Sequence, residues 1–170
     1  NISGGQAGDQ NGREVCITTY YNMGYNVVLR PKKRQLAENS AIACEKACAN
    51  DKIGYAQDDR NTLYTQAKAV GFDLSKISVP CECDCSSLQH LLAIIGGANL
   101  TYGSNGLTTR TMVNAFVASG DYEKLTASKY LTSDKYLLRG DVLVKEGSHT
   151  VMVLSDGDHA AEEKYKYSAS

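Results

Sequence analysis

The chain has 170 residues, of which 42% are hydrophobic and 22% are charged, values typical of a globular protein with a core of its own. Its 18 Lys and Arg against 19 Asp and Glu leave a formal net charge of −1, so no excess of either sign predicts nucleic acid or an anionic membrane as a partner. The apolar stretches are far shorter than the roughly 20 residues of a membrane-spanning helix. No signal peptide is evident, and a chain that opens on Asn1 is expected of a processed or excised domain.

In chain order, the first predicted elements are a loop, a hairpin and a helix. Residues 1–12 are rich in Gly, Asn and Gln and are expected to form a loop. Strand-forming residues predict strands over 15–21 and 26–31, joined as a hairpin. Apolar side chains at helical spacing predict a helix over 36–50, in which Cys44 and Cys48 face the same side and pack in the core.

The middle of the chain is predicted to be mostly helical. Residues 52–60 are expected to form a loop. Three helices should follow, each ended by glycine, over residues 61–71, 84–95 and 108–120.

After residue 121 the pattern changes to short β-branched runs, which predict strands over 141–144 and 150–155. Asp156-Gly157 predicts a hairpin turn and a returning strand near residues 159–167, with a frayed tail from about residue 166. Helices followed by antiparallel strands predict an α+β fold, in which N-terminal helices pack on a C-terminal antiparallel sheet. Without an internal repeat or a linker, residues 1–170 are expected to form a single domain.

The stretch CECDCSS, residues 81–87, places three cysteines in five residues. A structural zinc site usually pairs cysteines as C-x2-C and needs four ligands, whereas the spacing here is C-x-C-x-C without a second pair. A disulfide from Cys81 or Cys83 to Cys16, Cys44 or Cys48 would have to leave Cys85 reduced if Cys85 is a nucleophile. An inert, buried Cys85 is a further alternative.

Cys85 stands at the predicted start of a helix, behind Asp84, which is expected to be the N-cap. The free N–H groups and partial positive charge at a helix start stabilise a thiolate and can donate to an oxyanion. His90, on the same helix, projects about 140° away from Cys85. His149 instead begins a predicted strand after a glycine turn. A helix-borne Cys with a strand-borne His is typical of acyl transfer, so His149 is the predicted base.

DCSSL at residues 84–88, GDVLV at 140–144 and SHTVMVLSDG at 148–157 follow one another in this order. Over about residues 50–165 the chain resembles the NlpC-type and CHAP-type cell-wall cysteine peptidases. The opening GGQAGDQNGREV is similar to that of phage-encoded endolysins of this type. The resemblance implies a papain-like fold and a peptidoglycan hydrolase with Cys85 as nucleophile, His149 as base and no metal or organic cofactor.

The same resemblance implies where the protein acts. It would reach the bacterial cell wall after release from the host cytoplasm or by secretion, with peptidoglycan as its partner. A cell-wall-binding domain outside this chain would be consistent with that role.

The chain departs from the pattern of these families in two places. Ser148 stands where they have glycine before the histidine. The polar residue that orients the imidazole normally lies on the returning strand, where the expected register leads to Ala161. Glu162 is the favoured substitute, with His159 or Asp156 as alternatives after a register slip or bulge.

The resemblance also suggests residues for the oxyanion and the substrate. Tyr55 and Gln57 lie upstream of the cysteine, although an ordinary surface loop is the alternative for both. Asp84 and Ser86 flank Cys85 and complete this set of candidates.

The sequence therefore predicts a papain-like α+β domain that cleaves a stem-peptide bond of the cell wall, with the γ-D-glutamyl-diamino-acid linkage favoured by the resemblance. An N-acetylmuramoyl-L-alanine amidase with the same site is the alternative enzyme. A non-catalytic cell-wall-binding module with structural cysteines is a second alternative, and a toxin or effector acting on another amide is a third.

Overall fold

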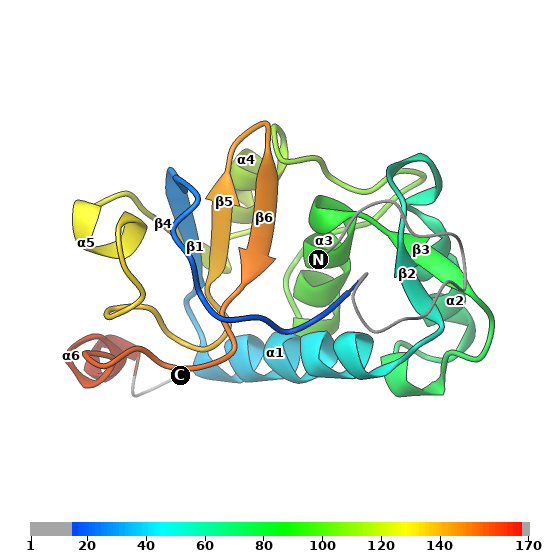
Figure 1. Cartoon of the computed structure of the whole chain (residues 1–170), viewed down its shortest axis with the longest axis horizontal. Helices are drawn as coiled ribbons and strands as arrows, with labels where there is room; N and C mark the ends of the chain where they lie inside the picture. The colour runs from blue at the N-terminus through cyan, green and yellow to red at the C-terminus, as the bar shows by residue number, and fades with distance from the viewer. Residues whose placement is uncertain (1–14, 168–170) are drawn as a thin grey trace.

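A four-stranded antiparallel sheet forms one half of the molecule in the computed structural model, which describes residues 15–167 (Figure 1). Its order is β4-β1-β5-β6. These strands are β1 (Val27–Pro31), β4 (Tyr122–Leu125), β5 (Val142–Lys145) and β6 (His149–Met152). All neighbouring strands pair antiparallel, and β6 lies at an edge, where one side of its backbone faces the helices. The predicted α+β class is confirmed.

The predicted helices are all present, although the helix predicted over 108–120 is shorter. They are α1 (Arg34–Ala49), α2 (Thr62–Ala69), α3 (Cys85–Gly96) and α4 (Met112–Ala118). Two further short helices, α5 (Ser128–Leu131) and α6 (Ala161–Lys164), lie beside the sheet at the end of the molecule opposite α2 (Figure 1). Short 3₁₀ turns form at η1 (Gln57–Asp59), η2 (Leu74–Lys76) and η3 (Tyr165–Tyr167).

The loop expected over residues 52–60 instead contains one strand of a second, two-stranded sheet, followed by η1. The strands β2 (Ile53–Tyr55) and β3 (Cys81–Cys83) pair in parallel, and Tyr55 lies opposite Cys83. All six residues are buried, because α2 covers the pair as the crossover between the two strands. This pairing brings Tyr55 to the start of α3.

The strand predicted over residues 15–21 is wrong, and so is the hairpin. Residues 16–26 carry no regular structure, and Ile17 is 62% exposed. Both sides of β1 are already paired, with β4 on one side and β5 on the other. No edge of β1 is therefore left for a hairpin partner. The strand predicted at 26–31 is confirmed as β1.

The returning strand predicted near residues 159–167 is also wrong, because α6 and η3 occupy this stretch. The Asp156 carboxylate accepts a hydrogen bond from the Arg139 N–H at 2.9 Å, and the Gly157 N–H donates to the Leu137 carbonyl at 2.9 Å. These two hydrogen bonds hold residues 156–157 against residues 137–139, so the chain does not fold back along β6. Tyr167 is buried instead of frayed, whereas the loop predicted over 1–12 and residues 168–170 lie outside the described residues.

The core is divided between the two sheets. Around β2, β3, α1 and α3 it contains Ile53, Leu63, Leu74, Leu88, Leu91 and Leu92. Between the four-stranded sheet and α4 it contains Val27, Leu29, Met112, Phe116, Val142 and Val144. The helix α3 touches both parts, and ten of its 12 residues are buried, so its position is fixed on several sides.

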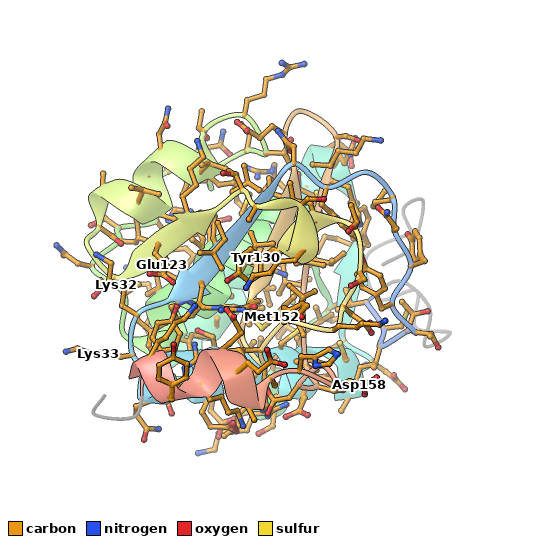
Figure 2. The ribbon with its side chains drawn as sticks, turned by 90° about the vertical axis from the view of Figure 1, so that its left-hand side faces the viewer. Lys32, Lys33, Glu123, Tyr130, Met152 and Asp158 are labelled. Carbon is orange, nitrogen blue, oxygen red and sulfur yellow. The ribbon has the colours of Figure 1, made fainter. Side chains whose placement is uncertain are left out.

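A buried ion network lies on β1 at the end of the molecule that Figure 2 turns towards the viewer. Arg30 is completely buried, and its guanidinium lies 2.8 Å from Asp141 and 2.8 Å from Glu163. Tyr130, labelled in Figure 2, donates its hydroxyl to Glu163 at 2.6 Å. The network therefore joins β1, α5, the start of β5 and α6.

Between residues 15 and 167 the structure contains no helix that is both long enough and apolar enough to cross a membrane.

Candidate active site

The first turn of α3 is capped as its sequence predicts. The Ser87 N–H donates to the Asp84 carboxylate at 2.9 Å, and the Asp84 N–H donates to the Ser87 hydroxyl at 2.9 Å. This reciprocal pair is a capping box, so Asp84 is confirmed as the N-cap. Cys85 is consequently the first residue of the helix, at its partially positive end.

The Cys85 side chain is 5% exposed and lies among hydrogen-bond donors from three elements. Burial and the neighbouring Asp84 carboxylate raise the pKa of the Cys85 thiol. Hydrogen bonds from the Tyr55 hydroxyl and from the backbone N–H groups of Thr150 and Ser86 act in the opposite direction. The site therefore has donors in place for a thiolate or an oxyanion.

The contact with Thr150 brings Cys85 to the edge of β6, at the residue that follows His149. His149 is the first residue of β6 and lies opposite Lys145. Burial lowers the pKa of the His149 imidazole from its ordinary value of 6.5. The imidazole is thus neutral at neutral pH and able to accept a proton. Cys85 and the backbone beside His149 meet although they lie far apart in the sequence.

The His90 side chain is buried and packs against residues 102–107 instead of facing Cys85. Its Nδ1 accepts the Leu107 N–H at 3.1 Å, and its ring stacks on Tyr102 with 4.8 Å between centroids. Burial lowers the pKa of His90 to about 4. A buried, neutral imidazole on the side of α3 that faces Tyr102 matches the expectation that His90 is a poor partner for Cys85.

Cys81 and Cys83 are strand residues whose thiols donate to carbonyls of the neighbouring segment. The Cys81 sulfur lies 3.8 Å from the Lys52 oxygen, and the Cys83 sulfur lies 3.6 Å from the Gly54 oxygen. Burial raises the pKa of Cys81 to about 12 and that of Cys83 well above its ordinary value. Cys85 is buried as well, but it stands at a helix start with the Tyr55 hydroxyl and two backbone N–H groups as donors, and this setting separates it from both.

All six cysteines are reduced in the structure. Cys44 and Cys48 face the same side of α1, as predicted, and form a hydrogen bond with each other. Within the described part of the chain, no three His, Cys, Asp or Glu side chains are placed to bind a metal ion together.

The candidates for binding the oxyanion or the substrate differ in exposure and in hydrogen bonding. Tyr55 is 3% exposed, and its hydroxyl bonds to Cys85. Gln57 lies exposed on η1. Ser86 is buried, and its hydroxyl accepts a hydrogen bond from Arg60 at 3.0 Å. The structure thus places Tyr55 and Ser86 at the start of α3, while Gln57 faces solvent.

The candidates for orienting the imidazole lie together near α6. The Glu162 carboxylate is 2.8 Å from Nδ1 of His159, and the His159 ring stacks on Tyr136. The Asp156 carboxylate pairs with Lys164. Because the returning strand is absent, the reasoning that favoured Glu162 loses its structural basis, and its role stays a prediction.

Arg60 belongs to the site but did not emerge from the sequence. Its Nε lies 2.7 Å from Oδ2 of Asp84, and its other nitrogens bond to Ser86 and to residues 105–107. It follows two aspartates in a polar stretch, where an arginine usually faces solvent. No local pattern indicates that its partners lie more than 20 residues further along the chain.

A cavity of about 540 Å³ lies beside α3 and β6. His149 and Gln89, one helical turn from Cys85, contribute to its lining. Most of the remaining lining comes from residues 15–21, α1 and residues 151–156, and Asp134 and Asp156 are its acidic residues. Apolar side chains and tyrosines dominate, and among the described residues no Lys or Arg lines it. Such a lining suits a peptide better than a strongly anionic ligand.

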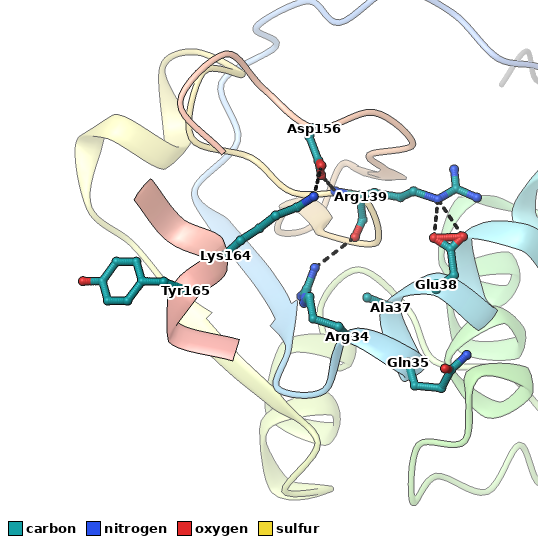
Figure 3. A pocket seen from close by; sticks show the side chains of 8 residues that line it. All are labelled: Arg34, Gln35, Ala37, Glu38, Arg139, Asp156, Lys164 and Tyr165. Atoms are coloured by element: carbon teal, nitrogen blue, oxygen red, sulfur yellow. Dashed lines mark hydrogen bonds and ion pairs between the residues drawn. The ribbon is translucent and has the colours of Figure 1, made fainter. Parts of the chain in front are cut away.

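A second cavity, of about 550 Å³, has a different character (Figure 3). Two pairs of its charged side chains are Lys164 with Asp156 and Arg139 with Glu38 at 2.8 Å, and Arg34 donates to backbone carbonyls. Neither Cys85 nor His149 lines this cavity. Of these two candidates, His149 lines the first cavity, whereas Cys85 lines neither.

A protein-family model described as an endolysin-like domain matches residues 1–160, so the chain belongs to the endolysin-like domain family. No curated protein and no solved structure matches the chain. Membership of this family indicates a phage cell-wall hydrolase with peptidoglycan as its substrate.

Proposed function

We propose that this endolysin-like domain is a papain-like cysteine peptidase of the NlpC or CHAP type that cleaves a stem-peptide bond of peptidoglycan. Cys85 is the nucleophile and His149 the base. The observation that carries the proposal is the setting of the Cys85 sulfur, which bonds to the Tyr55 hydroxyl and to the Thr150 N–H next to His149. Family membership supports the substrate class.

In this mechanism the resting pair is a neutral thiol and a neutral imidazole, because burial raises the pKa of Cys85 and lowers that of His149. As sulfur attacks the carbonyl carbon, His149 takes the thiol proton. The Tyr55 hydroxyl and the Cys85 N–H donate to the oxyanion. Collapse of the intermediate expels the amine, which receives the proton from His149 and leaves a thioester on Cys85.

Hydrolysis of the thioester completes the cycle. His149 takes a proton from water, the resulting hydroxide attacks the thioester carbonyl, and the Cys85 thiolate leaves and is reprotonated. The products are a free amine and a free carboxylate. Glu162 remains the proposed orienter of His149, and a Glu162→Gln variant with unchanged turnover would remove it from the mechanism.

The favoured bond is the γ-D-glutamyl-diamino-acid linkage, and the muramoyl-alanine amide is the alternative. The cavity beside His149, which no Lys or Arg of the described residues lines, favours a peptide over a strongly anionic ligand. Mass spectrometry of the fragments released from purified walls distinguishes the two, because each bond leaves a different new amine.

The Cys85→Ala variant tests the nucleophile. It should abolish clearance of a suspension of purified cell walls, while its sedimentation with the walls stays at the wild-type level. Cys81→Ala is the matched control, since it removes a buried thiol four residues away and should leave clearance intact. A Cys85→Ala protein that still clears the suspension would refute the assignment. Wild-type protein that binds walls without clearing them would instead support a binding module.

A further inference from the structure

Arg60 pairs with Asp84, the residue that precedes Cys85, and the mechanism above gives it no role. We infer that Arg60 is a positioning residue of the active site, which neutralises the Asp84 carboxylate beside Cys85 and fixes residues 105–107 against the start of α3. The inference rests on the proposed function, because it concerns the reactivity of the same cysteine.

The guanidinium of Arg60 has a fixed orientation because each of its five N–H donors has an acceptor. Nε donates to Oδ2 of Asp84 at 2.7 Å. Nη1 donates to the Asn105 side chain at 2.8 Å and to the Gly106 carbonyl at 2.7 Å. Nη2 donates to the Ser86 hydroxyl at 3.0 Å and to the Leu107 carbonyl. One side chain thus connects the N-cap of α3 with a loop about 20 residues further along the chain.

The charge of Arg60 matters because of where the Asp84 carboxylate lies. One of its oxygens caps the helix through Ser87, and the other faces Arg60. A carboxylate next to a thiol opposes ionisation of that thiol. Arg60 and Asp84 side chains are each 12% exposed, so solvent screens their interaction only partly. Pairing with Arg60 therefore reduces the opposing effect of Asp84 on Cys85.

The other groups around the Cys85 sulfur cannot replace this charge. Tyr55 from β2 and the Thr150 N–H from β6 are neutral donors, and His149 is neutral at neutral pH. The preceding thiol, Cys83, is fully buried. Within residues 15–167, Arg60 is the only cation that pairs with Asp84.

The loop has a second attachment next to Arg60. Oδ1 of Asn61 accepts the Tyr102 hydroxyl at 2.6 Å and the Gly106 N–H at 3.0 Å. The Leu107 N–H donates to His90 on α3. Asn61 therefore fastens the same loop without carrying a charge, and it offers a matched control for the electrostatic role of Arg60.

The test is the pH dependence of the rate at which iodoacetamide alkylates Cys85 in the whole folded chain, followed by peptide mass spectrometry. The midpoint is the pH at which the alkylation rate reaches half of its maximum. In Arg60→Gln this midpoint should rise by about one pH unit, and at a fixed pH below the midpoint alkylation should be about tenfold slower than in the wild type. Asp84→Asn should lower the midpoint. The double variant should return close to the wild type, because neither charge is present.

Two control variants separate charge from loop geometry. Asn61→Ala loosens the loop and should change the alkylation rate without moving the midpoint. Lys46→Gln removes the exposed ion pair with Asp73 and should have no effect. Circular dichroism confirms folding, and alkylation of the partly exposed Cys16 in the same samples is the internal reference.

An unchanged midpoint in Arg60→Gln would overturn the inference. So would a raised midpoint that Asp84→Asn does not reverse, since the effect would then be structural. Alkylation requires no cell wall, so its outcome is independent of the wall-clearance assay. If Cys85→Ala retains lysis, the proposed function fails, whatever the alkylation midpoints show.

Discussion

The Tyr55 hydroxyl has one clear partner in the site, the Cys85 residue. The side chain is buried on β2, and the parallel pairing with β3 fixes its distance from the start of α3. Burial raises the pKa of this tyrosine, so the group stays protonated and remains a donor over the whole working range of pH. A neutral donor held in place before the reaction can stabilise a developing oxyanion without reorganisation.

Replacing Tyr55 by Phe removes the hydroxyl and leaves the ring in the core. Loss of one oxyanion donor should lower kcat by about 100-fold, with a smaller effect on KM. Initial rates of wall clearance at several wall concentrations measure both constants. Tyr64→Phe is the control, because Tyr64 stacks on Tyr102 and makes no hydrogen bond to Cys85. Equal kcat values for Tyr55→Phe and the wild type would exclude Tyr55 as a donor.

Local sequence was enough to identify the residues at the helix start. Asp84 and Cys85 were predictable because a cap and the helix behind it are neighbours in the chain. Arg60 was not, since its partners lie 24 to 47 residues away and depend on the fold of β2, β3 and residues 101–107. The prediction of Glu162 as the orienting residue depended on a returning strand that the structure does not contain, so local sequence could not support it.

At the scale of elements, two adjacent glycines at the end of α3 have different roles. Gly96 lies against α1, and Gly97 ends the helix. A Cβ at Gly96 would lie 2.1 Å from the Ser40 hydroxyl and 2.9 Å from the Leu36 carbonyl. Gly96 therefore allows the two helices to approach closely. Gly97 has open space around its Cβ position but a φ of +106°, which ends α3 in the left-handed conformation.

The two alanine variants should consequently differ in stability. Gly96→Ala should cost about 3 kcal/mol, because either the helices separate or Ser40 leaves its hydrogen bond to Leu92. Gly97→Ala should cost about 1 kcal/mol, the strain of a left-handed alanine alone. Urea unfolding followed by circular dichroism measures both. Equal losses would show that α1 adjusts freely to an added methyl group.

Elements of different length were predictable to different degrees. The helices α1, α2 and α3 repeat their apolar pattern over several turns, so the sequence locates them within a few residues. The strands β2 and β3 have three residues each, too few for an alternating pattern. Residues 15–21 contain strand-forming side chains, but strand formation also requires a free edge, and β1 has none.

For the whole molecule, the Arg30 network joins parts of the chain that are distant in sequence. Burial raises the pKa of Glu163, but hydrogen bonds from Tyr130 and Arg30 outweigh this effect and lower it to about 2. The carboxylate thus stabilises the folded state at pH values above its ordinary pKa of 4.5. This contribution is lost as pH falls from about 4.5 towards 2.

Glu163→Gln should lower the free energy of unfolding by about 3 kcal/mol at pH 7, because Arg30 loses one of its two buried carboxylate partners. The difference in the free energy of unfolding between the variant and the wild type should become smaller below pH 4.5, where the wild-type carboxylate begins to take up a proton. Urea unfolding at pH 7, 4 and 3 measures this. Glu162→Gln, an exposed neighbour, should change stability by less than about 0.5 kcal/mol at each pH. A difference in the free energy of unfolding that stays constant at all three pH values would contradict a stabilising role for the ionised Glu163 carboxylate.

The position of β1 has a consequence for how the chain acquires its structure. This strand comes first among those described, yet it lies inside the sheet, and Arg30 on it bonds to partners 111 and 133 residues further along the chain. Contacts of such long range require large loops to close before they contribute, which slows folding. We therefore expect refolding on a timescale of about milliseconds to seconds. During synthesis, β1 should stay without strand partners until the residues of β4 and β5 have been made.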